Sequence, residues 1–278
     1  MVNDRRRGVA LIFVLWLLVL LGVAAAEIAT RARSEAEMVA SIRARAVGQY
    51  AAESGILLAS TEIETLLDSA PNPQQRAVLF HRLDSLNAIP HDIDVGAGRV
   101  GVAVIDLNAR LDLNRTDTTT LRALFSQFAR GADPRDLVRA LKREPVSRFP
   151  ELARVPGIDD ALAIAVAPYV TTWSDGDVNV NTAPAPVLTA LGVGKAGIQS
   201  IMDHRARGEV LTSTDGLRGG QTGAAVAVDA PLLTLAPTRL MLVARGWQPG
   251  APLTHEIQAV YVIVGTALVL QSWEERDR

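Results

Sequence analysis

RRRGVALIFVLWLLVLLGVAAAE, residues 5–27, is the stretch that decides the fold. Its uncharged run from Val9 to Ala26 would span about 27 Å as a helix, at about 1.5 Å rise per residue, which matches the hydrocarbon core of a bilayer. Three arginines precede this run and Glu27 follows it. Because positive charge favours the cytoplasmic side, the sequence predicts a single-pass anchor with its N-terminus in the cytoplasm and the rest of the chain across the membrane.

The apolar run continues into a long amphipathic segment. No proline occurs before Pro71, so we predict one helix from about Val9 to Ser69, ended by the proline. A cleaved secretory signal, with a cleavage site at Ala24–Ala26, and a simple anchor are the alternatives. The helix is favoured over both because apolar residues recur after the membrane at spacings of three and four, namely Ala52, Ile56, Ala59, Ile63 and Leu66.

Composition excludes several classes of protein. The chain of 278 residues has a formal net charge of -2 and a pI of about 6.1, so it lacks the basic excess of a dedicated nucleic-acid binder. It contains no cysteine, which excludes disulfides, thiolate zinc sites and a cysteine nucleophile. The sequence has no nucleophile elbow, P-loop or other catalytic constellation, so we expect no enzyme. The histidines form no metal-ligand pair and are expected at the surface or as caps: His81, His91, His204 and His255.

The rest of the chain predicts an antiparallel sheet interrupted by helices. Alternating apolar residues predict strands at Arg99–Asp106, Arg239–Trp247, His255–Val264 and Ala267–Trp273. Between the first and second strands, a helix is expected from Thr118 or Thr119 to Phe128, and short helices separated by turns follow it as far as Leu217. The predicted fold class is α+β. A long N-terminal transmembrane helix packs on an antiparallel sheet, with an inserted α-helical subdomain.

The expected organisation divides the chain into five parts. They are a leader at 1–8, a transmembrane part of the helix at 9–26, an amphipathic continuation at 27–70, an α/β domain formed by 71–116 and 230–278, and an inserted α-helical domain at 117–229.

Two stretches rich in Asp and Asn are interpreted as structural turns. In Asp106–Asn114 these side chains are expected to cap backbone groups, because the stretch lacks a convincing set of metal ligands. Asp175–Asn179 places oxygens at alternate positions, as calcium loops do, but it lacks the central Gly and the downstream Glu of such loops. We therefore expect no metal site at either stretch.

A second motif resembles the helix-hairpin-helix of DNA-uptake proteins. Gly192 and Gly194 surround an apolar residue, so backbone N–H groups could approach a phosphate at a helix N-terminus, and Lys195 would add positive charge. Such modules usually bind DNA through paired hairpins. The partner hairpin here, Pro156–Asp160, carries two carboxylates that would repel a phosphate. A structural hairpin is therefore expected, with no nucleic-acid partner, and phosphate contact is the alternative.

The N-terminal layout resembles type IV pilins and the pseudopilins of type II secretion. In those families a prepilin peptidase cuts after the Gly that ends a short basic leader, which implies cleavage between Gly8 and Val9. The fifth mature residue is then Phe13. Most members carry Glu there, where it pairs with a neighbouring subunit's N-terminal amine. An uncharged residue at that position is characteristic of minor pseudopilin K of the general secretion pathway, and RRRGVALIFVLWLL is similar to that family in particular.

The resemblance to minor pseudopilin K extends over nearly the whole chain. It includes Asp106–Asn114, Glu151–Gly157, Pro168–Thr171, Val178–Ala183 and the last strand ending at Gln271–Ser272. The family's pilin-like sheet with an inserted α-domain agrees with the reading given above. One stretch departs from the pattern. Between Leu141 and Phe149 the family usually carries an acidic segment linked to calcium, and this chain has Lys142–Pro145. No cofactor is therefore expected, and calcium binding is the alternative.

The resemblance implies a function in protein secretion. Its expected place is the tip of a periplasmic pseudopilus on the bacterial inner membrane, with the C-terminal domain in the periplasm. The implied partners are minor pseudopilins I and J, other pseudopilins, the prepilin peptidase and the inner-membrane secretion platform. A membrane-anchored protein for DNA binding or uptake, and a minor pilin of a type IV pilus, are the alternatives.

Overall fold

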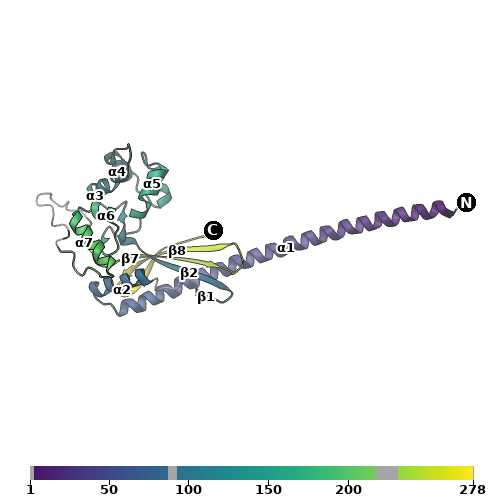
Figure 1. Cartoon of the computed structure of the whole chain (residues 1–278), viewed down its shortest axis with the longest axis horizontal. Coiled ribbons are helices and arrows are strands. Elements are labelled where there is room, and N and C mark those ends of the chain that lie inside the picture. The colour runs from purple at the N-terminus through teal and green to yellow at the C-terminus, as the bar shows by residue number, and fades with distance from the viewer. Residues whose placement is uncertain (1–2, 87–92, 216, 218–230, 278) are drawn as a thin grey trace.

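A single long helix dominates the molecule. The computed structural model describes residues 3–86, 93–215, 217 and 231–277. Helix α1 (Asn3–Asp68) is continuous, and its N-terminal half stands free of the globular part (Figure 1). The sequence predicted this continuity. The helix begins at Asn3 rather than Val9, so the described residues of the leader belong to it, and it ends at Asp68, beside the predicted Ser69.

The main sheet has five antiparallel strands in the order β1-β2-β7-β8-β9. The four long strands confirm the prediction. Their bounds agree with the predicted ones to within one residue, except at the C-terminal end of β9, because alternating apolar residues mark each strand. β9 runs four residues further than expected, since Glu274–Asp277 pair with β8 although they carry no apolar alternation. The bounds are β1 (Ile93–Val95), β2 (Gly98–Asp106), β7 (Arg239–Trp247), β8 (Thr254–Val264) and β9 (Ala267–Asp277).

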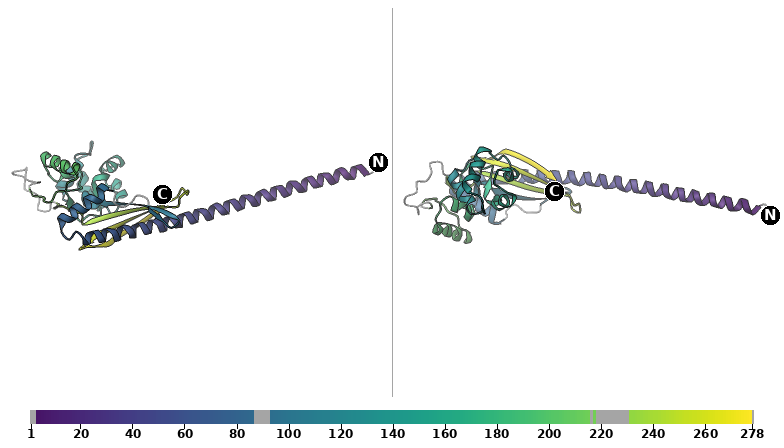
Figure 2. Two further views of the ribbon diagram at one scale, coloured as in Figure 1. Left: turned by 60° about the horizontal axis from the view of Figure 1, so that its bottom comes forward. Right: turned by 90° about the horizontal axis from the view of Figure 1, so that it is seen from above.

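Short helices fill the chain between β2 and β7, and they gather at the end of the molecule opposite the N-terminus (Figure 2). Three of them begin after an aspartate, Asp117, Asp133 or Asp159, whose carboxylate accepts backbone N–H groups of the first turn. The helices between these two strands are α3 (Thr118–Phe125), α4 (Pro134–Arg143), α5 (Asp160–Val166), α6 (Ala185–Ala190) and α7 (Lys195–Ala206). Helix α2 (Pro73–Leu86) precedes the sheet in the chain. The remaining elements are η1 (Leu107–Ala109), η2 (Phe149–Arg154), η3 (Ala167–Tyr169), β3 (Leu111–Asp112), β4 (Val170–Thr171), β5 (Val178–Asn179) and β6 (Leu233–Thr234).

The C-terminal half of α1 packs along one face of the sheet. Small residues at the centre of this contact let helix and strands approach closely. Gly48 of α1 lies against Gly246 of β7, where a Cβ on Gly246 would come within 2.1 Å of the Gly48 carbonyl oxygen. The apolar side chains of both elements form one buried core, which includes Ala51, Ala52, Ile56, Ala59, Ile63, Leu67, Val100, Val102, Leu240, Leu242, Ala244, Ile257 and Ala259.

The helical insert has a separate core. It is built from α3 to α7 and the segments between them, and Phe125, Leu137, Leu152, Val166 and Leu188 are among its buried side chains. Leu111 and Leu113 also belong to this core, although they precede the expected boundary at 117. The chain therefore joins the helical core directly after β2 and η1. The expected end of the insert at 229 lies outside the described residues.

The face of the sheet opposite α1 carries a buried carboxylate. Glu256 of β8 is fully buried and accepts hydrogen bonds from Arg245, Gln258 and Arg276. Burial alone would raise the pKa of Glu256, but the bonds from the two guanidinium groups and the amide outweigh it and lower the pKa to about 2. The ionised carboxylate thereby links three adjacent strands.

Gly246→Ala should destabilise the globular part by about 2 kcal/mol or more, because the new methyl group would meet backbone atoms of α1 that cannot move independently. Urea unfolding of the full chain in detergent, followed by tryptophan fluorescence, measures this loss. Gly22→Ala is the matched control, since nothing lies within 4 Å of its added methyl. Equal stability of Gly246→Ala and the wild type would contradict the close contact of helix and sheet.

Low pH should lower the stability of the fold because it protonates Glu256. Its pKa is lowered in the folded state, so its stabilisation is present above its ordinary pKa of 4.5 and is lost as the pH falls through about 2. Glu256→Gln should therefore be less stable at neutral pH and should lose less stability between those two pH values. Urea midpoints measured across this range test the slope, with exposed Glu62→Gln as the control. An unchanged slope in Glu256→Gln would refute this role.

Candidate functional site

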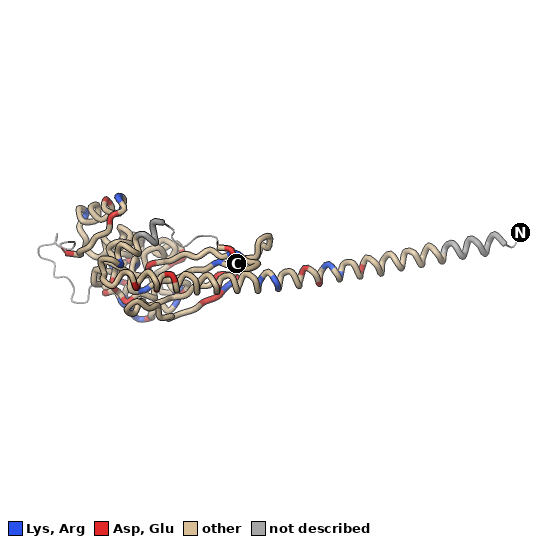
Figure 3. The backbone as a smooth tube through the Cα atoms, turned by 90° about the horizontal axis from the view of Figure 1, so that it is seen from below, with Lys and Arg blue, Asp and Glu red and all other residues tan. Residues whose placement is uncertain are grey.

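The free half of α1 presents an uncovered apolar surface. From Phe13 to Val23 its large apolar side chains are between 50% and 72% exposed, and no residue of the most apolar window is buried. The described chain has one helix that is long and apolar enough to cross a membrane. Figure 3 shows a long stretch of this helix without charged residues, which ends at the first acidic and basic residues on the side of the globular part. This half of α1 is therefore suited to lipid or to other helices.

The predicted processing and assembly residues lie on this part of α1. Gly8 and Val9 lie in its continuous helical backbone. Phe13 is 72% exposed, so its ring packs on no other element of the described chain. Phe13 can make apolar contacts, but it cannot neutralise a positive charge.

Polar residues join the sheet to the helical insert where the chain leaves β2 and where it returns to β7. Asn108 is fully buried, and its amide donates to the Asp175 carboxylate at 2.8 Å. Its oxygen accepts the backbone N–H groups of Thr238 and Arg239, each at 3.0 Å. The side-chain amide of Asn108 therefore links the segment after β2, the loop at Asp175 and the start of β7. The predicted turn over Asp106–Asn114 has this structural role.

Asp106 supports the same junction from the end of β2. Its carboxylate accepts the Asn108 N–H, the Asn179 amide and the Thr182 hydroxyl. Burial raises the pKa of Asp106, although these hydrogen bonds oppose the rise. Both of its oxygens accept hydrogen bonds from within the protein.

The turn at Asp175–Asn179 is likewise closed by internal hydrogen bonds. One Asp175 oxygen accepts from Asn108 and from the Asp177 N–H, and the other accepts from the Thr238 hydroxyl. Gly176 adopts a φ of +101°, which the turn requires. Among the described residues no group of three or more His, Asp or Glu side chains is arranged to hold a metal ion.

Lys142 holds the neighbouring loop in the segment where the sequence departs from minor pseudopilin K. Its ammonium donates to the carbonyl oxygens of Leu113, Asn114 and Thr116, at 3.3, 2.8 and 2.8 Å. Burial lowers the pKa of Lys142, and the carboxylates of Asp112 and Asp117 oppose this shift. The ammonium of Lys142 therefore fixes this loop through three of its carbonyl oxygens.

The sequence-predicted hairpin is formed between α6 and α7. Gly192 has a φ of +78° and Gly194 is the N-cap of α7, while Val193 between them is buried in the helical core. Lys195 is exposed at the first turn. Added Cβ atoms on the two glycines would meet nothing within 4 Å, so the backbone of this hairpin is accessible.

The second hairpin is closed to a phosphate. Gly157 has a φ of +88°, as a hairpin of this kind requires. The Asp159 carboxylate, however, accepts the Leu162 N–H at 2.7 Å and so occupies the N-terminus of α5 with its own negative charge. The two hairpins therefore do not form a pair of equivalent phosphate sites.

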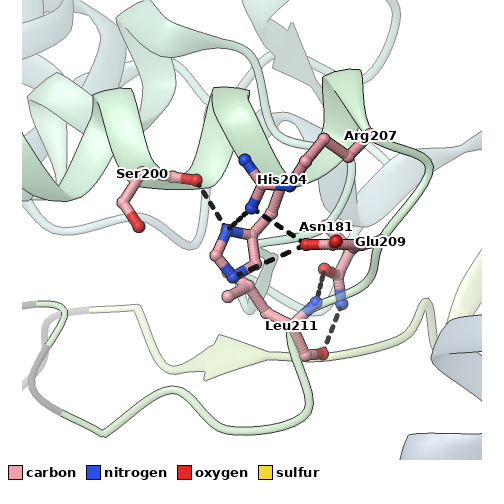
Figure 4. A network of polar contacts seen from close by, with 6 residues as sticks. All are labelled: Asn181, Ser200, His204, Arg207, Glu209 and Leu211. Atoms are coloured by element: carbon pink, nitrogen blue, oxygen red, sulfur yellow. Dashed lines mark hydrogen bonds and ion pairs between the residues drawn. The ribbon is translucent and has the colours of Figure 1, made fainter.

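The histidines take up separate structural positions. His204 lies near the C-terminus of α7, where Nδ1 contacts the Ser200 carbonyl and Arg207 (Figure 4). In the same region Asn181 fixes the following segment through the N–H group of Leu211. His255 corrects the expectation of a surface or capping residue. It is 5% exposed and its Nδ1 lies 2.8 Å from Asp277, because β9 extends far enough to cover it.

Comparison with known proteins places the fold. No protein-family model and no curated protein sequence matches the chain. The fold is similar to that of a chain in the solved GspK-GspI-GspJ complex from the type 2 secretion system of enterotoxigenic Escherichia coli, with a TM-score of 0.55 and 16% sequence identity. The match covers 84% of this chain and 99% of that chain. This protein therefore has the GspK-like, pilin-like α+β fold that the sequence predicted.

Lys142→Met should lower the free energy of unfolding by about 1–3 kcal/mol, because it keeps the apolar stem and leaves three carbonyl oxygens without their donor. Urea unfolding of the full chain measures the loss. Lys195→Met is the matched control, since that side chain is exposed, and should change stability by no more than about 0.5 kcal/mol. A chelator should leave the wild type unchanged. Stabilisation of the wild type by calcium would contradict the role of Lys142.

Proposed function

We propose that this protein is a minor pseudopilin of a type II protein secretion system, of the K class. The first part of α1 anchors it in the bacterial inner membrane with the N-terminus in the cytoplasm, and the C-terminal domain lies in the periplasm. The observation that carries the proposal is the GspK-like fold on a chain that begins with a basic leader and an exposed apolar helix.

Processing by a prepilin peptidase is part of this proposal. The cut falls between Gly8 and Val9 and removes the arginines that hold the N-terminus on the cytoplasmic side. Without that charge, the apolar part of α1 is free to leave the lipid and pack beside the helices of other pseudopilins. The role is one of assembly, and the chain has no catalytic function.

Phe13 supports a place for the subunit at the tip of the pseudopilus. In a pseudopilin with Glu at this position, the carboxylate pairs with the N-terminal amine of a neighbouring subunit. Phe13 offers an exposed ring and no charge, so a subunit stacked above it would leave its amine unpaired in an apolar surrounding. The position that requires no such pair is the tip, where no subunit lies above. The helical insert, at the end of the molecule away from the membrane, would also obstruct stacking.

The proposed partners are minor pseudopilins I and J. The matched structure is a complex of GspK with GspI and GspJ, and we carry this association to the present chain. Other pseudopilins and the inner-membrane platform would contact the assembled tip.

The experiment is co-purification of the full chain with minor pseudopilins I and J from the same secretion system, each alone and both together, after detergent extraction. The proposal predicts a complex of all three proteins at one stoichiometry. The major pseudopilin, produced at the same level, is the control and should not replace either partner. Failure of the chain to bind I, J or the pair would refute the proposed class.

Phe13→Glu should leave secretion unchanged or reduce it, because a tip subunit has no amine above it to neutralise and the new carboxylate would lie uncompensated among apolar helices. Export of a secreted enzyme by cells that carry the variant measures the effect. Phe13→Leu, which keeps an apolar side chain, is the control and should secrete normally. Improved secretion with Phe13→Glu would contradict the position at the tip.

A membrane-anchored DNA-binding protein is the second candidate, favoured by the accessible glycines of the α6-α7 hairpin and the exposed Lys195. Retardation of duplex DNA by the full chain in detergent, lost in Lys195→Met, would support it. The Asp159 cap on the companion hairpin argues against it. A minor pilin of a type IV pilus shares the leader and differs in its partners, which co-purification distinguishes.

A further inference from the structure

A hollow of about 620 Å³ lies on the face of the sheet opposite α1. Its floor is formed by side chains of β2, β7 and β8 that alternate with those of the buried core, because successive residues of a strand point to opposite faces. Phe149, the first residue of η2, adds a side chain of the helical insert to the lining. We call this space the sheet hollow, and its lining includes Ala103, Ile105, Arg110, Phe149, Val243 and Trp247.

An ion pair joins the insert to the same face of the sheet. Arg148, directly before Phe149, lies 3.7 Å from the Glu274 carboxylate of β9. Glu274 is the register partner of Gln258, which lines the hollow, so the pair lies on the hollow's side of the sheet. The sheet hollow is therefore bounded by the sheet and by the insert.

The floor of the hollow is apolar and elongated. Ile105, Met241 and Val243 supply aliphatic or thioether side chains to it. From Met241 to Trp247 the lining follows β7 for a length of about 20 Å, at about 3.3 Å per residue. A hollow that follows a strand for this distance fits a short extended peptide better than a compact small molecule.

Arg110 brings an unpaired charge to this apolar lining. Its side chain is half-buried, and no hydrogen bond or ion pair of its guanidinium is found among the described residues. Burial lowers the pKa of Arg110, and the charge of Asp106, whose oxygens accept from other groups, opposes this shift. Taking a guanidinium out of water without giving it acceptors costs free energy. An anion that reaches Arg110 from the hollow would offset that cost.

The charges of the lining favour a single carboxylate. Arg245 donates to Glu256 at 2.7 Å, so these two charges offset one another and the positive charge of Arg110 remains. One guanidinium can hold a carboxylate through two parallel hydrogen bonds. Phosphate and nucleic-acid sites gather several free basic groups or the first turn of a helix, and the described lining of this hollow has neither.

We propose that the sheet hollow binds an extended segment of another protein, with an Asp or Glu side chain of that segment on Arg110 and a neighbouring large apolar side chain on Ile105 and Val243. The segment lies along β7, beneath Phe149 of the insert. This binding site goes beyond the pseudopilin assignment, because it belongs to the sheet and the insert and makes no use of α1.

Selection from a phage-displayed library of random short peptides tests the proposal. The full chain is held in lipid nanodiscs, so that no detergent fills the hollow, and the displayed peptides offer side-chain carboxylates without a free C-terminus. Selected peptides should carry Asp or Glu beside a large apolar residue several times more often than the input library. A selection that yields no binders, or binders without this enrichment, would overturn the proposal.

Variants of the full chain then locate the bound peptide, which is labelled with fluorescein and titrated by anisotropy. Arg110→Leu should weaken binding by about tenfold or more, because the carboxylate loses its partner. Ala103→Phe, which fills the floor and keeps Arg110, should also weaken binding. Arg143→Leu, at an exposed position of α4, is the matched control and should bind as the wild type does. Unchanged binding in either hollow variant would refute the site.

Replacing the acid of the peptide by its amide identifies the contact of the carboxylate. The wild type should bind the amide peptide about tenfold more weakly than the acid, and Arg110→Leu should bind the two peptides equally. If Arg110→Leu still distinguishes them, the carboxylate lies elsewhere and the proposal is wrong.

Stability separates a binding role of Arg110 from a structural one. Arg110→Leu should leave the urea midpoint of the full chain unchanged or raise it, because the guanidinium has no partner among the described residues to lose. A clear fall in the midpoint would show that Arg110 supports the fold and would contradict the proposal.

Discussion

The contact of α1 with the sheet is the constraint on which the rest of the structure depends. Gly48 and Gly246 bring the two backbones so close that no side chain fits between them, and the small and aliphatic residues that follow bury a continuous core along the helix. Burial of this area stabilises the sheet from one face, and the other face carries the Glu256 network. Only a helix that is already long and straight can provide both a core face and a membrane segment.

Helix α1 serves two purposes, since one half packs on the sheet and the other half is an exposed apolar segment, and the arrangement of the rest of the molecule depends on both. The sheet packs on the second half of α1, and the exposed first half continues as the same helix beyond the globular part, where it is open to lipid or to other helices. The insert is joined to the sheet at the end of β2 and the start of β7 by buried amide and carboxylate groups around Asn108. Its location at the end of the molecule opposite the N-terminus supports the proposed place at the tip (Figure 2).

Much of the fold could be predicted from the sequence because its signals are local. The alternation in β2, β7 and β8 and the proline-free run of α1 each indicate their own secondary structure.

The pairings that position the polar groups were not predictable, since they join distant residues. Nothing near Gly48 indicates that Gly246 will meet it, and His255 becomes buried only because Asp277 pairs with it across the sheet. The two-residue strands are too short to show a period. In the sequence, Lys142 is distinguished only by standing where minor pseudopilin K usually has an acidic segment. Its three carbonyl partners could not be predicted, because they lie about 28 residues earlier in the chain.

The central claim is that α1 is the assembly element of a pilin-class protein, released by cleavage after Gly8. The intact mass of the full chain, extracted from membranes with and without a co-expressed prepilin peptidase, tests it most directly. The account predicts loss of residues 1–8 when the peptidase is present, with Val9 as the new first residue, and an uncut chain when it is absent. A chain that stays uncut in both cases, or one that is cut near Ala26, would contradict the account.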